Sequence, residues 1–173
     1  MSNLFPMQDV IDLYHALQDA DIPIWLDGGW GVDALLEVQT RPHDDLDIVI
    51  EEKNLEPFLN LMQKMGYFEI KKEDTCPWNF VLSHHNLLEI DVHVVNFDAN
   101  GHGIYGPKER GIYYPAYAFK GMGKLKGTVL PCLTAEYQLE SHTGYVLREK
   151  DFKDIAALCK KFKLPNPNLL YDL

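Results

Sequence analysis

The chain has 173 residues, of which 46% are hydrophobic and 24% charged, and its formal net charge at pH 7 is -10. This amount of apolar material excludes general disorder and is enough for one domain with a sizeable core. The negative charge argues against nonspecific binding to nucleic acid or to an anionic membrane, since both need a basic surface, and it suits a cationic small molecule better.

The sequence shows no sign of secretion or of membrane insertion. Its three cysteines are far apart and odd in number, which indicates neither a disulfide framework nor a zinc site. The N-terminal segment lacks a basic region and is interrupted by Asp9, Asp12 and Asp19, unlike a signal peptide. No stretch approaches the ~20 apolar residues that span a bilayer. We therefore expect a cytoplasmic protein with no membrane contact.

The first part of the chain predicts alternating helices and strands. Apolar residues at helical spacing, strand-like runs of β-branched residues and glycine breaks give the boundaries. Helices are expected at 7–20, 30–38 and 54–67, and strands at 22–27 and 45–52. The helix at 30–38 follows Gly28 and Gly29, so its first turn should lie directly beyond these glycines.

The second part predicts antiparallel strands followed by helices. Strands are expected at 68–74, 78–85 and 87–97, hairpins and irregular loop at 98–127, and helices at 134–147 and 150–162. We therefore expect a core over residues 1–130 and a helical portion over residues 131–173, packed together as one compact unit.

Three aspartates, Asp44, Asp45 and Asp47, crowd the start of the predicted strand 45–52. Because side chains alternate along a strand, Asp45 and Asp47 project to one side, about 7 Å apart, and Asp44 to the other, where a surface position suits it. Without a cation, two such carboxylates repel each other. Hard oxygen ligands of this kind suit magnesium or manganese, completed by substrate phosphates and water.

A fourth carboxylate, Asp91, lies in the middle of the apolar strand 87–97. A lone carboxylate there is costly to bury unless it is paired, hydrogen-bonded or faces a site. If this strand lies beside residues 45–50, Asp91 completes a triad that holds a second metal or takes a proton from an attacking hydroxyl. Glu89 and His93 share the face of Asp91, and a structural hydrogen bond explains each at least as well as a role in the site.

Gly28 and Gly29 separate a predicted strand from a predicted helix. A strand, a glycine turn and a helix start present unpaired backbone N–H groups and the positive end of the helix dipole to a phosphate. The pattern therefore predicts a phosphate site next to the aspartates. Asp33 is as well explained by a structural pair as by a ligand contact, and Trp30 fits packing against the sheet better than stacking on a ligand.

In this order, the segments WLDGGWGVD, RPHDDLDI, LEIDVHVVNFD, LPCLTAEYQL and HTGYVL resemble the lincosamide nucleotidyltransferases. These small antibiotic-modifying enzymes are related to the aminoglycoside adenylyltransferases within the DNA polymerase beta-like superfamily. The resemblance implies the nucleotidyltransferase fold, an α/β (α+β) architecture with a short mixed sheet flanked by helices and a small C-terminal helical portion.

The resemblance also implies the reaction, which is transfer of a nucleoside monophosphate, AMP from ATP first, to a hydroxyl of a small antibiotic with release of pyrophosphate. The acceptor would be lincosamide-like first and aminoglycoside-like second. Two Mg²⁺ ions would be held by Asp45, Asp47 and Asp91, with Asp91 as the general base. The nucleotide would be bound by Gly28, Gly29, Arg41 and His43.

Candidates for the acceptor pocket are Glu89, His93, His142 and Tyr145. His142 and Tyr145 lie three apart on the predicted helix 134–147, and helix packing explains both better than a pocket does. Two other functions are open at this stage: nucleotidyl transfer to a protein or RNA, and nucleotide binding without catalysis. The charge disfavours RNA, and the three aspartates disfavour a pure binder. The sequence fixes neither the acceptor nor the oligomeric state, for which a homodimer is one option.

Overall fold

The computed structural model describes residues 4–142 and 146–167. The helices are α1 Met7–Asp19, α2 Gly28–Leu36, α3 Leu55–Lys64, α4 Ala135–Ser141 and α5 Glu149–Phe162. The strands are β1 Ile24–Leu26, β2 Asp45–Glu51, β3 Tyr67–Ile70, β4 Asn79–His84, β5 Glu89–Phe97, β6 Gly103–Tyr105, β7 Tyr113–Tyr114, β8 Gly121–Leu125 and β9 Thr128–Cys132.

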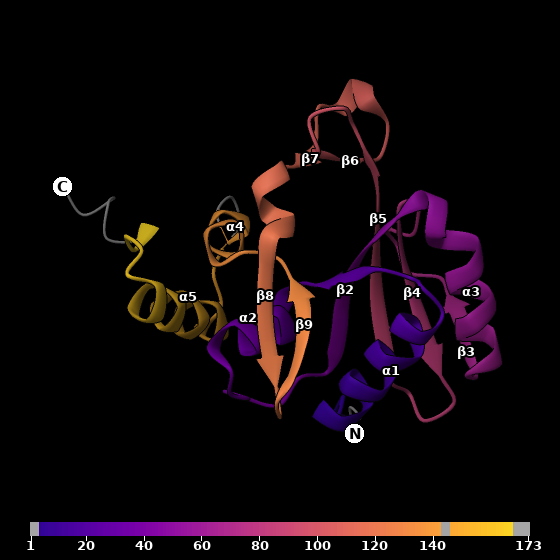
Figure 1. Cartoon of the computed structure of the whole chain (residues 1–173), viewed down its shortest axis with the longest axis horizontal. Helices are drawn as coiled ribbons and strands as arrows, with labels where there is room; N and C mark the ends of the chain where they lie inside the picture. The colour runs from indigo at the N-terminus through magenta and orange to yellow at the C-terminus, as the bar shows by residue number, and fades with distance from the viewer. Residues whose placement is uncertain (1–3, 143–145, 168–173) are drawn as a thin grey trace.

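The strands form one mixed sheet, which confirms the expected α/β architecture. Their order is β3-β4-β5-β2-β1-β9-β8, and the β6–β7 hairpin extends from β5. The pairs β2–β5 and β1–β9 are parallel, whereas the other pairs are antiparallel. Helix α3 flanks the β3 end of the sheet, and α4 and α5 lie beyond the β8 end (Figure 1).

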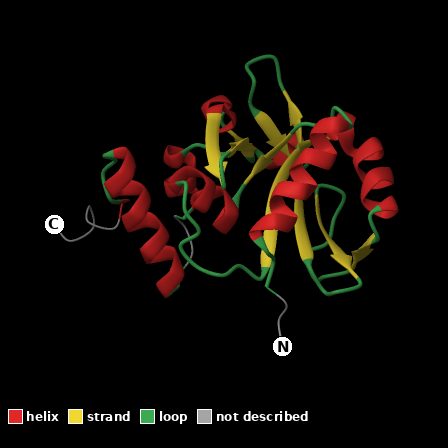
Figure 2. Ribbon diagram, turned by 60° about the horizontal axis from the view of Figure 1, so that its bottom comes forward, coloured by secondary structure: helices red, strands yellow, loops and turns green. Residues whose placement is uncertain are grey.

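The two faces of the sheet bury different side chains. Leu46, Ile48 and Ile50 of β2 are fully buried against the helices, in the same cluster as Phe58 of α3 and Leu17 of α1. Figure 2 shows helices covering this side of the strands. Burying each such side chain stabilises the fold by roughly 1.5–3 kcal/mol. The alternate residues of β2 face the other side, where the polar site lies.

Helix α5 is joined to the core by apolar packing. Its buried Ile155 and Leu158 belong to the main cluster of the sheet and helices. Pro131 and Cys132 complete β9, so the helical portion begins at α4, just beyond the sequence-based boundary at residue 130. Among the described helices, none is both long and apolar enough to cross a bilayer.

Several sequence-based helix boundaries were wrong; Tyr67, expected at the end of a helix, begins β3. Helix α2 begins at Gly28 itself, because Asp27 caps its start, so the glycines form the first turn instead of preceding it. Helix α4 ends at Ser141, well short of residue 147, and His142 is its C-cap. Residues 143–145, including Tyr145, lie outside the described residues, so the expected pairing of His142 and Tyr145 on one helical face is not seen.

Candidate active site

Strands β2 and β5 bring the predicted carboxylates together. They pair in parallel, with Asp47 opposite Asp91 and Asp45 opposite Glu89. Neighbouring strands lie about 4.8 Å apart, so Asp47 and Asp91 project side by side from one face. Asp44 is exposed, as expected for a surface residue. Alternation along two strands therefore gathers Asp45, Asp47 and Asp91, as the sequence predicted.

Burial and neighbouring carboxylates raise the pKa of two of these groups, Asp91 and Asp45. Burial, followed by the charges of Asp47 and Asp45, raises the pKa of Asp91 from its ordinary 3.8 to about 6. Burial and the neighbouring Asp47 also raise the pKa of Asp45. The protein thus holds more negative charge at this point than it neutralises, which is the condition under which a cation binds favourably.

The two glycines are required by the close approach of side chains. Gly28 has φ +54°, and a Cβ there would overlap the carboxylate of Asp47. A Cβ on Gly29 would overlap the ring of His43 and the guanidinium of Arg41. The start of α2 is therefore in direct contact with the site residues, and only glycine fits both positions.

His43 is held in one tautomer by its partners. Arg41 Nη1 lies 2.9 Å from His43 Nδ1, and a guanidinium has no acceptor, so Nδ1 must accept this hydrogen bond. The proton is then on Nε2, which donates to the Asp33 carboxylate at 2.5 Å. Asp33 and His43 are both buried. Asp33 thus has the structural pairing that the sequence left open, and His43 is a neutral link behind Arg41.

Arg41 joins this region to the C-terminal helix. Its Nη2 donates to Asp154 of α5 at 3.0 Å, and Asp154 is buried. The guanidinium is therefore fixed from two directions, by His43 and by Asp154. This rigid placement orients its remaining surface toward the cavity beside Gly29.

A second histidine, His93, lies next to Asp47. Asn79 Nδ2 donates to Asp74, so Asn79 Oδ1 accepts the Tyr105 hydroxyl proton at 3.0 Å. Tyr105 must then accept from His93 Nδ1 at 3.1 Å, which leaves His93 Nε2 facing Asp47 at 4.0 Å. Burial alone would lower the pKa of His93, but the neighbouring Asp47 carboxylate and the charges of Asp27 and Asp91 raise it.

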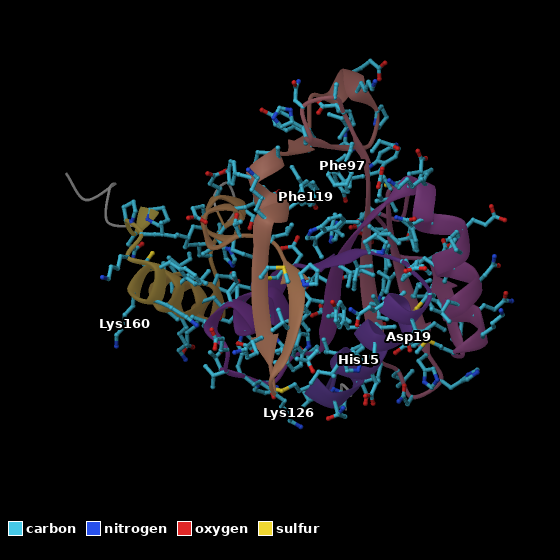
Figure 3. All side chains as sticks on the ribbon, viewed as in Figure 1. His15, Asp19, Phe97, Phe119, Lys126 and Lys160 are labelled. Atoms are coloured by element: carbon cyan, nitrogen blue, oxygen red, sulfur yellow. The ribbon has the colours of Figure 1, made fainter. Side chains whose placement is uncertain are left out.

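Beyond His93 the same face of the sheet becomes aromatic. Phe97 and Phe119 lie next to each other near the β6–β7 hairpin, with ring centroids 4.7 Å apart (Figure 3). Tyr105, Tyr114 and Trp25 pack in the same group. The carboxylates therefore border a polar cavity, and further along the same face these packed aromatic side chains form an aromatic wall.

The polar cavity has a volume of about 230 Å³ and lies between α2, β2, α4 and α5. It is lined by Asp27, Gly28, Gly29, Arg41, His43, Asp45, Asp47, Gln138, Ser141, His142, Arg148, Lys150, Asp151 and Asp154. All four predicted nucleotide-binding residues line it, and His142 does so from the end of α4. Asp91 is not among its lining residues and lies on the side of Asp47 toward His93.

Glu89 shares the face of Asp91 but forms an ion pair with a surface lysine. Its carboxylate pairs with Lys72 at 3.1 Å, at an exposed position. His142 Nδ1 donates to the Gln138 carbonyl oxygen at 2.5 Å, which fixes its ring at the cavity wall. Both residues thus have structural hydrogen bonds, the alternative that the sequence allowed.

Several cavity residues had no signal in the sequence. Of these residues, Asp27 could most easily have been predicted from the sequence, because an aspartate before a helix start is a typical N-cap. Its Oδ1 accepts the Gly28 N–H at 2.7 Å. Gln138, Lys150 and Asp154 lie about a hundred residues from the aspartate strand. No local sequence pattern predicts that these three residues lie beside that strand.

The fold and the site together define a nucleotidyltransferase. The sequence profile described as Aminoglycoside-2''-adenylyltransferase matches residues 9–158, and the chain belongs to this family. A lincosamide resistance protein of Staphylococcus haemolyticus is 31% identical over 150 residues, which cover 86% of this chain and 89% of the relative. The chain is therefore an enzyme of the antibiotic nucleotidyltransferases.

Solved structures agree with this assignment. The lincomycin-bound crystal structure of the lincosamide antibiotic adenylyltransferase LnuA is 28% identical, with a TM-score of 0.79, and covers 90% of this chain and 98% of that chain. ANT(2'')-Ia in complex with adenylyl-2''-tobramycin, at 18% identity, shares the fold with a TM-score of 0.66, covering 90% of this chain and 88% of that chain.

Proposed function

We propose that this enzyme transfers AMP from ATP to a hydroxyl of a lincosamide and releases pyrophosphate. The observation that carries the proposal is the parallel pairing of β2 and β5, which sets Asp45, Asp47 and Asp91 beside the start of α2. The lincosamide resistance protein and the lincomycin-bound structure, at 31% and 28% identity, support a lincosamide ahead of an aminoglycoside.

The donor set at the site fits magnesium. Carboxylate oxygens are its preferred protein ligands, and burial followed by the charges of neighbouring carboxylates raises the pKa of both Asp45 and Asp91. Within the described residues, no three His, Cys, Asp or Glu side chains form a metal site by themselves. Phosphate oxygens and water would therefore complete the coordination of two ions. Once bound, they would neutralise charge on the α-phosphate and on the leaving pyrophosphate.

Asp91 would act as the general base. Its carboxylate would take the proton of the acceptor hydroxyl while the hydroxyl oxygen forms a bond to the α-phosphorus. The bond from the α-phosphorus to the bridging oxygen would break, and pyrophosphate would carry away that electron pair. A pKa of about 6 suits this task, because a base is most effective when its pKa lies near the working pH.

The triphosphate would lie over the start of α2. The Gly28 N–H already donates to Asp27, so the N–H groups of Gly29 and Trp30 are those that the helix start offers to a phosphate. Arg41 would supply positive charge, with His43 acting through it. Lys150 lines the same cavity, and its charge partly opposes the burial and the neighbouring Asp47 that raise the pKa of Asp45.

The acceptor would approach from the aromatic side of Asp91. His93 lies two residues along β5 from Asp91, Tyr105 contacts His93, and Phe97 and Phe119 continue the wall. An apolar and aromatic surface with few polar groups suits a drug that carries alkyl groups. A polycationic aminoglycoside would need more carboxylates there, which again favours a lincosamide.

The experiment is a pyrophosphate-release assay with ATP, GTP, CTP and UTP in magnesium, run against lincosamides and aminoglycosides. Asp45→Asn is the inactive comparison, and Asp44→Asn, at an exposed position, is the matched control. We expect release that depends on ATP and a lincosamide, is retained in Asp44→Asn and is lost in Asp45→Asn. Pyrophosphate release with aminoglycosides alone would show that the acceptor is an aminoglycoside and not a lincosamide. No pyrophosphate release with any acceptor would reject the proposed reaction.

A further inference from the structure

The amide of Gln138 is buried without a hydrogen bond. Gln138 is fully buried in α4, yet neither Nε2 nor Oε1 has a partner within the described part of the chain. Its backbone is satisfied, because its N–H donates to Thr134 O and its carbonyl accepts from Ser141 and His142. Folded proteins seldom leave a buried amide unpaired at both ends, since its desolvation is not repaid.

This amide is directed at the start of α2. A Cβ on Gly31 would overlap Gln138 Nε2, so the glycine at that position admits the amide. The Asp27 carboxylate is near enough for Gln138 to lower its pKa, against the larger opposite effect of burial, but the two form no hydrogen bond of ordinary geometry. Gln138 and Gly28 line the same cavity. The unpaired amide therefore faces the place where the triphosphate would lie.

The surroundings indicate what the amide binds. The helix start beneath it favours anions, and Arg41, Arg148 and Lys150 line the same cavity, where Asp154 pairs with Arg41 and Asp151 with Arg148. Phosphate oxygens accept hydrogen bonds, and Gln138 Nε2 carries two hydrogens to donate. The polyphosphate of the donor nucleotide is the ligand that matches both the charge and the missing acceptor.

We propose that Gln138 is a binding residue for the polyphosphate of the donor, to which Nε2 donates. The inference rests on the proposed function and adds a residue of α4 to the nucleotide site. It predicts an unusual combination: removing the amide should weaken nucleotide binding without weakening the fold, because the amide has no hydrogen bond of ordinary geometry to any residue that the structure describes. A structural glutamine would behave in the opposite way.

The test uses Gln138→Met, which keeps the length and volume of the side chain and removes both polar atoms. Gln63→Met makes the same change at an exposed position of α3, far from the cavity, and serves as the control. Binding of ATP and of inorganic tripolyphosphate, each with magnesium, is measured by calorimetry, and the melting temperature is measured without ligand. Gln138→Leu repeats the test in case methionine perturbs packing.

We expect Gln138→Met to lose about tenfold in affinity for both ligands, equivalent to ~1.4 kcal/mol, with an unchanged or higher melting temperature. The Michaelis constant for ATP should rise, and that for the acceptor should not. Three results would each overturn the inference: unchanged affinity for both ligands, a lower melting temperature in both Gln138→Met and Gln138→Leu, or a loss of affinity for ATP but not for tripolyphosphate. If the wild type binds ATP but transfers nothing, the proposed function fails while the Gln138 result still stands.

Discussion

The charge cluster predicts that Asp91→Asn stabilises the metal-free protein at neutral pH while it abolishes catalysis. The pKa of Asp91 is raised from 3.8 to about 6, so folding favours its protonated form. The stabilisation from that proton is complete below pH 3.8 and is lost as the pH rises through 6. The difference corresponds to ~3 kcal/mol, and because Asp91 is only half-buried, solvent screening reduces the expected gain to ~1–3 kcal/mol.

The assay is urea unfolding of both proteins in EDTA at pH 4 and at pH 7.5. Asp91→Asn should exceed the wild type at pH 7.5, and the gap should close toward pH 4, because asparagine does not titrate. Asp44→Asn, which removes an exposed carboxylate nearby, should show no such gap. If the stability advantage of Asp91→Asn at pH 7.5 is no larger than at pH 4, the conclusion that burial and the neighbouring carboxylates raise the pKa of Asp91 is refuted. Magnesium and ATP should reverse the order, because they stabilise whichever protein binds them.

Three further outcomes follow from the site. Gly28→Ala should cut transfer by more than tenfold, because φ +54° is strained for alanine and its Cβ would displace Asp47; activity near that of the wild type would show that the helix start is not in contact with the site. Arg41→Lys should raise the Michaelis constant for ATP several-fold, since lysine cannot hold two partners with one planar group. An unchanged Michaelis constant would exclude a role of Arg41 in nucleotide binding. Hydrogen bonds from Arg148 lower the pKa of Asp151, although burial opposes this effect, so the stabilisation by these bonds is present above the ordinary pKa of 3.8 and is lost as the pH falls through the lowered value. In urea unfolding, Asp151→Asn should therefore lose less stability than the wild type as the pH falls. An equally steep loss in the variant would contradict this prediction.

Local rules predicted the carboxylates well and the cavity poorly. Alternation along a strand placed Asp45 and Asp47 on one face, and an isolated charge in an apolar strand marked Asp91, because both signals lie within a few residues. The contacts of Gln138 and Asp154 depend on where α4 and α5 pack, about a hundred residues along the chain. Packing of this kind is decided by the whole core, so a short window of sequence does not contain it.

The same long-range contacts explain why residues of the C-terminal helix line the candidate site. Asp33 orients His43, His43 accepts from Arg41, and Arg41 is anchored on Asp154 of α5. Asp154 is buried, so losing its ion pair with Arg41 leaves its charge without that partner in a poorly solvated place, which is strongly unfavourable, whereas Asp33 keeps its hydrogen bonds from Thr40. A displacement of α5 would therefore move the Arg41 guanidinium and the phosphate side of the cavity, while Asp91 and the aromatic wall stay fixed in the sheet. Mutations that loosen α5, at the buried Ile155 or Leu158, should thus raise the Michaelis constant for the nucleotide before that for the acceptor, and equal effects on both would show that the two sides of the site are not independent.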